Sequence, residues 1–101
     1  MKNFGLTERD FLIIGQILSK YKSVKEVRIF GSRSKGVNHT GSDIDLAIMD
    51  HVPGLDVLLH LKSDFDDSDL PYTVDIVCYS KLNHQELKDH INRVGKVVYR
   101  A

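Results

Sequence analysis

The chain has 101 residues, of which 42% are hydrophobic, which is typical of one globular domain that buries roughly two thirds of its unfolded surface. Fourteen Lys and Arg residues balance fourteen Asp and Glu residues, so the strongly basic surface expected of a nucleic-acid-binding protein is absent. The sequence shows neither a signal-peptide pattern nor an apolar run of roughly 18 residues, so we expect residues 1–101 to form a single cytoplasmic domain with neither DNA nor a membrane as partner.

The first half of the chain combines one helical pattern with two extended ones. Apolar residues recur at helical spacing over 7–22, and Thr7 with Asp10 has the spacing of a capping box, which predicts a helix that ends near position 22. Strict alternation over 24–30 and again over 43–49 predicts two half-buried strands.

The second half repeats these elements. An amphipathic pattern over 57–65 predicts a helix, and the alternating run 72–79 predicts a third strand. Asn83 is the expected start of a last helix, Gly95 is its expected end, and residues 96–100 are expected to add a short strand. This order predicts an α/β fold in which helices pack on a small sheet.

Three carboxylates fall on the strand face that is not apolar. Asp43 and Asp45 are two residues apart, so they point to the same side of their strand, and Asp75 interrupts a run of β-branched residues. If helices cover only the apolar side, these three share an open face. Converging carboxylates form an all-oxygen site that suits Mg²⁺ or Mn²⁺. The alternative is a structural ion cluster with Arg28.

The same spacing elsewhere has a different interpretation. The pairs Asp64/Asp66 and Asp67/Asp69 lie in a polar stretch typical of a solvated helix end. Cys78 lies in an apolar run, where a small core residue is expected rather than a nucleophile. No histidine has a zinc-like spacing to it or to another histidine, so we assign no zinc site.

The turn after the first strand has the composition of an anion site. Gly31 permits a tight turn, and Ser32 can cap a short helix running toward Lys35. Free backbone N–H groups at such a helix start suit a triphosphate. The alternative is an ordinary capped turn.

Gly31-Ser32, ten further residues, Asp43-Ile44-Asp45 and then Asp75 together resemble the signature of the polymerase-β-like nucleotidyltransferase superfamily. Within it, the chain is similar to the minimal nucleotidyltransferases (MNT), over nearly its whole length. The resemblance implies a small mixed β-sheet flanked by helices, with ATP as the expected nucleotide. It implies that catalysis and Mg²⁺ ligation rest on Asp43, Asp45 and Asp75, and that the nucleotide is bound by Gly31, Ser32, Arg33 and Ser42.

The mechanism expected on this basis is two-metal nucleotidyl transfer. Asp43 and Asp45 would hold one Mg²⁺ on the triphosphate, and Asp75 would help bind a second ion that activates an acceptor hydroxyl.

The resemblance also implies a partner, because minimal nucleotidyltransferases pair with all-helical HEPN proteins. In several such pairs the HEPN protein acts as an RNase toxin, and the nucleotidyltransferase then acts as its antitoxin by adenylylating it or by binding it. A non-catalytic nucleotide-binding antitoxin is therefore the main alternative function. An aminoglycoside-type adenylyltransferase is disfavoured because it would need a further domain for its acceptor. Docking is expected at exposed Tyr72, Tyr79 and Tyr99, or along the helix at 57–65.

Overall fold

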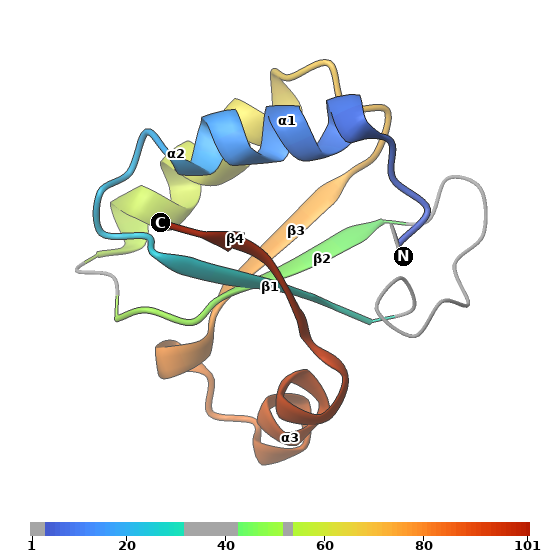
Figure 1. Ribbon diagram of the computed structural model, residues 1–101. Coiled ribbons are helices and arrows are strands. Elements are labelled where there is room, and N and C mark those ends of the chain that lie inside the picture. Colours follow the sequence, from blue (N-terminus) through green and yellow to red (C-terminus); the bar gives the residue numbers. More distant parts are fainter. Residues whose placement is uncertain (1–3, 32–42, 52–53) are drawn as a thin grey trace.

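The computed structural model describes residues 4–31, 43–51 and 54–101 (Figure 1). It contains three α-helices and four strands in these residues, together with one 3₁₀ turn at Tyr79–Lys81. In chain order the elements are α1 (Glu8–Leu18), β1 (Glu26–Phe30), β2 (Ile44–Ile48), α2 (Leu55–Asp66), β3 (Val74–Cys78), α3 (Gln85–Val94) and β4 (Lys96–Arg100). Every helix and strand predicted from the described residues is present. The helix predicted after Ser32 lies outside the described residues.

The four strands form one sheet in the order β3-β2-β1-β4. β1 pairs antiparallel with both β2 and β4, whereas β2 and β3 are parallel and are joined through α2. A parallel pair needs such a crossover, because a tight hairpin can only reverse the chain direction. The mixed sheet flanked by helices is the predicted fold class.

The larger hydrophobic core lies between the sheet and the layer of α1 and α2 (Figure 1). Alternate strand residues point into it, and Val27, Ile29, Leu46 and Ile48 are completely buried. Leu61 of α2 packs against them and is also completely buried. The predicted apolar face of the sheet is therefore the face that these two helices cover.

The opposite face of the sheet is not fully open, which corrects the sequence-based expectation. α3 lies on this face, where Phe30, Ala47 and Ile91 form a small second cluster of buried residues (Figure 1). The apolar stripe of α3 must be buried against another element, and Phe30 of β1 and Ala47 of β2 provide that surface. Of the predicted carboxylates, Asp43 and Asp75 remain exposed and Asp45 is half-buried.

The predicted start of α1 is confirmed, whereas the end of α1 and the start of α3 differ from the prediction. The capping box of α1 is formed, with the Asp10 N–H donating to Thr7 Oγ1 at 3.1 Å and the Thr7 N–H donating to Asp10 Oδ2 at 2.9 Å. α1 ends at Leu18 rather than near position 22, because the backbone tightens into three-residue turns there. α3 is capped by His84 instead of Asn83: its Nδ1 accepts from the Leu87 N–H at 3.2 Å.

Of the two predicted docking surfaces, the tyrosines are less exposed than expected, whereas the helix remains available. Tyr72, Tyr79 and Tyr99 are each half-buried, since their rings pack against the two apolar clusters. α2 instead exposes Leu55 and Leu59, which are 64% and 59% accessible. Cys78 is buried, as predicted for a core residue. Among the helices that the structure describes, none has the length and apolar character required to cross a bilayer.

Candidate nucleotide and metal site

The structure places two of the three predicted carboxylates side by side. Asp45 of β2 pairs with Asp75 of β3 in the parallel register, so the two residues are direct neighbours across the sheet. Both point away from the larger core, because their strand neighbours Ile44, Leu46 and Val74 are buried in it. Asp45 is half-buried and Asp75 is exposed, which places the pair at the rim of the α3 face.

Asp43 lies two positions before Asp45, just outside β2, and is exposed. The Ile44 N–H between them donates to the Thr73 carbonyl at 2.9 Å, which ties this end of β2 to β3. Within residues 4–31, 43–51 and 54–101, no three His, Cys, Asp or Glu side chains are grouped closely enough to hold a metal ion. The register thus brings Asp45 and Asp75 together, and a three-carboxylate metal site stays a prediction.

Gly31 closes the site from β1. Its φ of +78° lies in the left-handed region, which a residue with a side chain rarely adopts. A Cβ at this position would overlap the carboxylate of Asp45. Phe30, directly before it, is paired with Asp45 across β1 and β2. Glycine is therefore required here both for the turn and for close approach of the backbone to the carboxylate.

α3 contacts the same turn through a histidine that sequence reasoning missed. The Gly31 N–H donates to His90 Nε2 at 3.3 Å, and the His90 ring packs edge-on to Phe30 with centroids 6.1 Å apart. A signal for this residue exists in the sequence: position 90 is three residues after Leu87 and four before Val94, so it falls on the apolar stripe of the helix.

The alternative ion cluster with Arg28 is not formed. Arg28 Nε lies 2.9 Å from Glu26 Oε2 on its own strand, and Arg100 contacts the other oxygen of Glu26 at 3.3 Å. The guanidinium of Arg28 is therefore used at the β1–β4 side of the sheet. Of the predicted nucleotide-binding residues, Gly31 is described, whereas Ser32, Arg33 and Ser42 lie outside the described residues.

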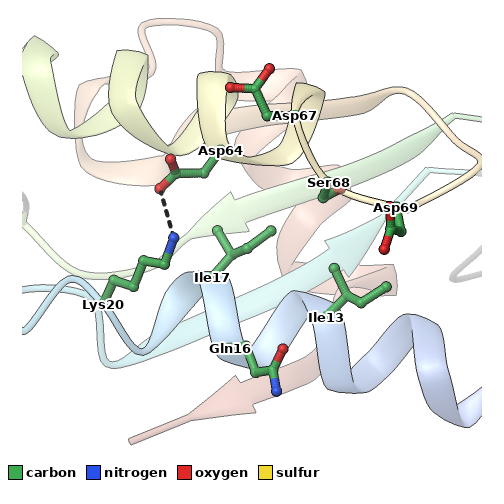
Figure 2. A pocket seen from close by; sticks show the side chains of 8 residues that line it. All are labelled: Ile13, Gln16, Ile17, Lys20, Asp64, Asp67, Ser68 and Asp69. Carbon is green, nitrogen blue, oxygen red and sulfur yellow. Dashed lines mark ion pairs between the residues drawn. The ribbon is translucent and has the colours of Figure 1, made fainter.

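A second acidic region lies on the other side of the sheet, in a groove of about 340 Å³ between α1 and α2 (Figure 2). Its floor is apolar, and its rim carries Lys20, Asp64, Asp67 and Asp69. Figure 2 shows Lys20 reaching Asp64, with Nζ and Oδ2 3.8 Å apart.

Asp64 has a structural role that the sequence did not indicate. Its Oδ2 accepts a hydrogen bond of 2.5 Å from the Tyr21 hydroxyl. This bond, with desolvation and the carboxylate charge, raises the pKa of Tyr21 to about 12. Asp66, Asp67 and Asp69 are exposed, as predicted for a solvated helix end. The acidic groove therefore belongs to the contact between the two helices and is separated by the sheet from Asp45.

Comparison with known proteins gives concordant matches. The sequence model of the family described as "Polymerase beta, Nucleotidyltransferase" matches residues 13–101. A "Probable protein adenylyltransferase MntA" from Haemophilus influenzae is 34% identical over 95 residues, which cover 92% of this chain and 82% of the relative.

Solved structures share the fold. A crystal structure of a toxin–antitoxin with AMP-PNP superposes with a TM-score of 0.73 at 23% identity, covering 94% of this chain and 75% of the other. A nucleotidyltransferase from Sulfolobus solfataricus, solved at 1.40 Å resolution, gives a TM-score of 0.57 at 20% identity, covering 89% of this chain and 76% of the other.

Proposed function

The chain belongs to the polymerase beta nucleotidyltransferase family, as a minimal nucleotidyltransferase, and from this membership we propose that it transfers AMP from ATP to a hydroxyl on a separate helical protein. The observation that carries the proposal is that Asp45 pairs with Asp75 across β2 and β3, while the Asp45 carboxylate lies against Gly31 at the end of β1. Residues 1–101 are proposed to act as one catalytic domain.

The proposed metal ligands are Asp43, Asp45 and Asp75. Adjacent carboxylates repel one another unless a cation or a proton compensates them, and an all-oxygen donor set is the one that Mg²⁺ prefers. The space that a Cβ would fill at Gly31 is occupied by the Asp45 carboxylate, so the chain keeps this carboxylate beside the turn. Bound Mg²⁺, with Mn²⁺ as the alternative and two ions expected, would supply positive charge to the phosphates and to the attacking oxygen.

The remaining work falls to the chain's own residues. Gly31 sets the direction in which the backbone leaves β1. The other proposed nucleotide-binding residues are Ser32 and Arg33, which follow Gly31 in the sequence, and Ser42, which directly precedes Asp43. During transfer, the acceptor oxygen bonds to the α-phosphorus while the bond to the α,β-bridging oxygen breaks, and pyrophosphate leaves. Exposed Asp75 is the group that we assign to accept the hydroxyl proton.

Two observations favour a protein as the acceptor: the net charge of this chain, and the descriptions of its relatives. A net charge of zero gives little attraction for a nucleic-acid end. The relative from H. influenzae is described as a probable protein adenylyltransferase, and solved structures of similar fold include toxin–antitoxin complexes. We therefore propose a HEPN-type helical protein as acceptor and partner in a hetero-oligomer, with this chain as antitoxin. Exposed Leu55 and Leu59 of α2 offer an apolar surface for such a complex.

Transfer of label tests the proposal. The chain is incubated with α-labelled ATP, Mg²⁺ and the protein that the neighbouring gene encodes, and both proteins are analysed by mass spectrometry. We expect AMP on a hydroxyl of the neighbour, lost with Asp45→Asn and retained with the control Asp66→Asn on α2. Tight complex formation without transfer would support the non-catalytic antitoxin instead. Efficient adenylylation of an aminoglycoside by the chain alone would contradict both.

A further inference from the structure

His90 connects the last helix to the turn of the candidate site. It lies on α3 immediately before Ile91, the completely buried residue through which α3 packs on Phe30 and Ala47. Its Nε2 accepts the Gly31 N–H at 3.3 Å, and its ring meets Phe30 edge-on, with an interplanar angle of 79°. Because Nε2 accepts here, the proton of the neutral imidazole is on Nδ1.

The position of this contact gives it influence over the site. Glycine populates many backbone conformations, so the left-handed turn at Gly31 needs an external contact to fix the orientation of its peptide. The bond to His90 holds the peptide between Phe30 and Gly31, and Gly31 is the residue at which a Cβ would overlap the Asp45 carboxylate. Freeing this peptide would change both the direction in which the chain leaves β1 and the spacing between backbone and carboxylate.

We propose that His90 is a positioning residue that orders the Gly31 turn for the triphosphate through its Nε2 acceptor. This inference rests on the proposed function, because it assigns the order of the turn to nucleotide binding. His90 acts through Gly31, and it has no assigned contact with the nucleotide. α3 thereby has two roles: Ile91 packs it on the sheet, and His90 holds the Gly31 turn in place.

Two substitutions separate the acceptor from the ring. His90→Phe keeps an aromatic ring against Phe30 but leaves the Gly31 N–H without this acceptor. His90→Gln loses the ring, yet its side-chain amide reaches about as far as Nε2 and its oxygen can accept. His60→Phe is the matched control for replacing a histidine, because His60 is exposed and lies on α2, at the other side of the sheet.

Two readouts are measured at about pH 8, where an ordinary imidazole is neutral. Amide hydrogen exchange of Gly31 by NMR, without nucleotide, reports the contact itself. Calorimetric titration with ATP and Mg²⁺ reports its effect on binding. For His90→Phe we expect faster Gly31 exchange and roughly threefold to tenfold weaker ATP binding, the equivalent of one lost hydrogen bond. His90→Gln should restore both to within about twofold, and His60→Phe should match the wild type.

Other outcomes would overturn the inference. If His90→Phe binds ATP as tightly as the wild type, the acceptor has no role in positioning. If His90→Phe and His90→Gln weaken binding equally, an acceptor at this position does not restore binding, and the role assigned to Nε2 is wrong. Faster Gly31 exchange without weaker binding would leave a contact that is only structural. A wild-type chain that binds no ATP would overturn the proposed function and this inference with it, which the wild-type titration distinguishes from the other outcomes.

Discussion

The two faces of the sheet are built from the same alternating strands, yet they are covered to different extents. α1 and α2 lie over one face with a continuous core that includes Ile14, Leu18 and Leu61, all at most 1% exposed. Around α3 on the other face, the buried residues that the structure describes are Ala47 and Ile91, which are completely buried, and Phe30, which is 8% exposed. Asp45 and Asp75 also lie on this second face, where Asp45 is half-buried and Asp75 is exposed. We infer that the first face mainly supplies stability, while the thinner cover of the second leaves Asp43 and Asp75 exposed.

Cavities in the two cores should therefore have different consequences. Leu61→Ala opens a cavity in the larger core and should cost about 3–5 kcal/mol of unfolding free energy. Ile91→Ala, in the smaller cluster, should cost about 2–3 kcal/mol, because α3 can shift over a nearly open face. Denaturant unfolding measures both. Amide exchange should show local loosening of α3 and of Gly31 in the Ile91 variant but not in the Leu61 variant. Equal costs with equal, global loosening would contradict the division between the faces.

A substitution at the turn should affect the site beyond its effect on stability. Gly31→Ala places a methyl group against the Asp45 carboxylate at a φ of +78°. The strained backbone should cost about 1–3 kcal/mol, and ATP binding should fall at least roughly tenfold as Asp45 is displaced. Thermal melting and calorimetry measure the two effects. The control Gly15→Ala, in α1 with no atom within 4 Å of the added Cβ, should be neutral or slightly stabilising. Unchanged ATP affinity in Gly31→Ala would place the nucleotide elsewhere.

The smallest predicted effect concerns the α1–α2 contact on the stable face. Tyr21→Phe removes the hydrogen bond to Asp64 and should cost about 0.5–1.5 kcal/mol without changing ATP affinity. The folded-state pKa of Tyr21 is raised from 10.0 to about 12. Its contribution is therefore complete below the unfolded pKa and is lost as pH rises through that window. Unfolding measured across this window should show a steeper loss for the wild type than for Tyr21→Phe. Parallel curves would show that the bond does not contribute.

Sequence patterns predicted the features that depend on neighbours along the chain. The capping box of Thr7 and Asp10 and the alternation of each strand are local, and the polar face could be assigned before the sheet order was known. The pairing of Asp45 with Asp75 followed only if β2 and β3 were adjacent, which the structure confirms. The assignment of a metal to them stays a prediction.

Contacts between distant elements were not predictable from such patterns. The stripe of α3 indicates that it packs, but not on which face, so the cover over Phe30 and Ala47 was missed. The place of His90 on the stripe of α3 indicates that it faces the sheet, but its partner Gly31 is known only once α3 is placed beside β1. Asp64 differs from its exposed neighbour Asp66 only because Tyr21 lies across the groove. These roles are set by packing between elements.

Asp43, Asp45 and Asp75 are proposed to bind a nucleoside triphosphate together with Mg²⁺. Asp43→Asn/Asp45→Asn should melt at or above the wild-type temperature, because removing neighbouring like charges relieves repulsion. Melting curves therefore separate a lost site from a lost fold, and Asp66→Asn on α2 is the matched control.

Calorimetric titration with ATP, in Mg²⁺ and in excess chelator, tests the claim most directly. We predict that the wild type and Asp66→Asn bind ATP in Mg²⁺, that chelator weakens this binding at least roughly tenfold, and that Asp43→Asn/Asp45→Asn weakens it similarly while remaining folded. Equal binding of ATP with Mg²⁺ and with chelator, or unchanged affinity in the folded double variant, would contradict the account.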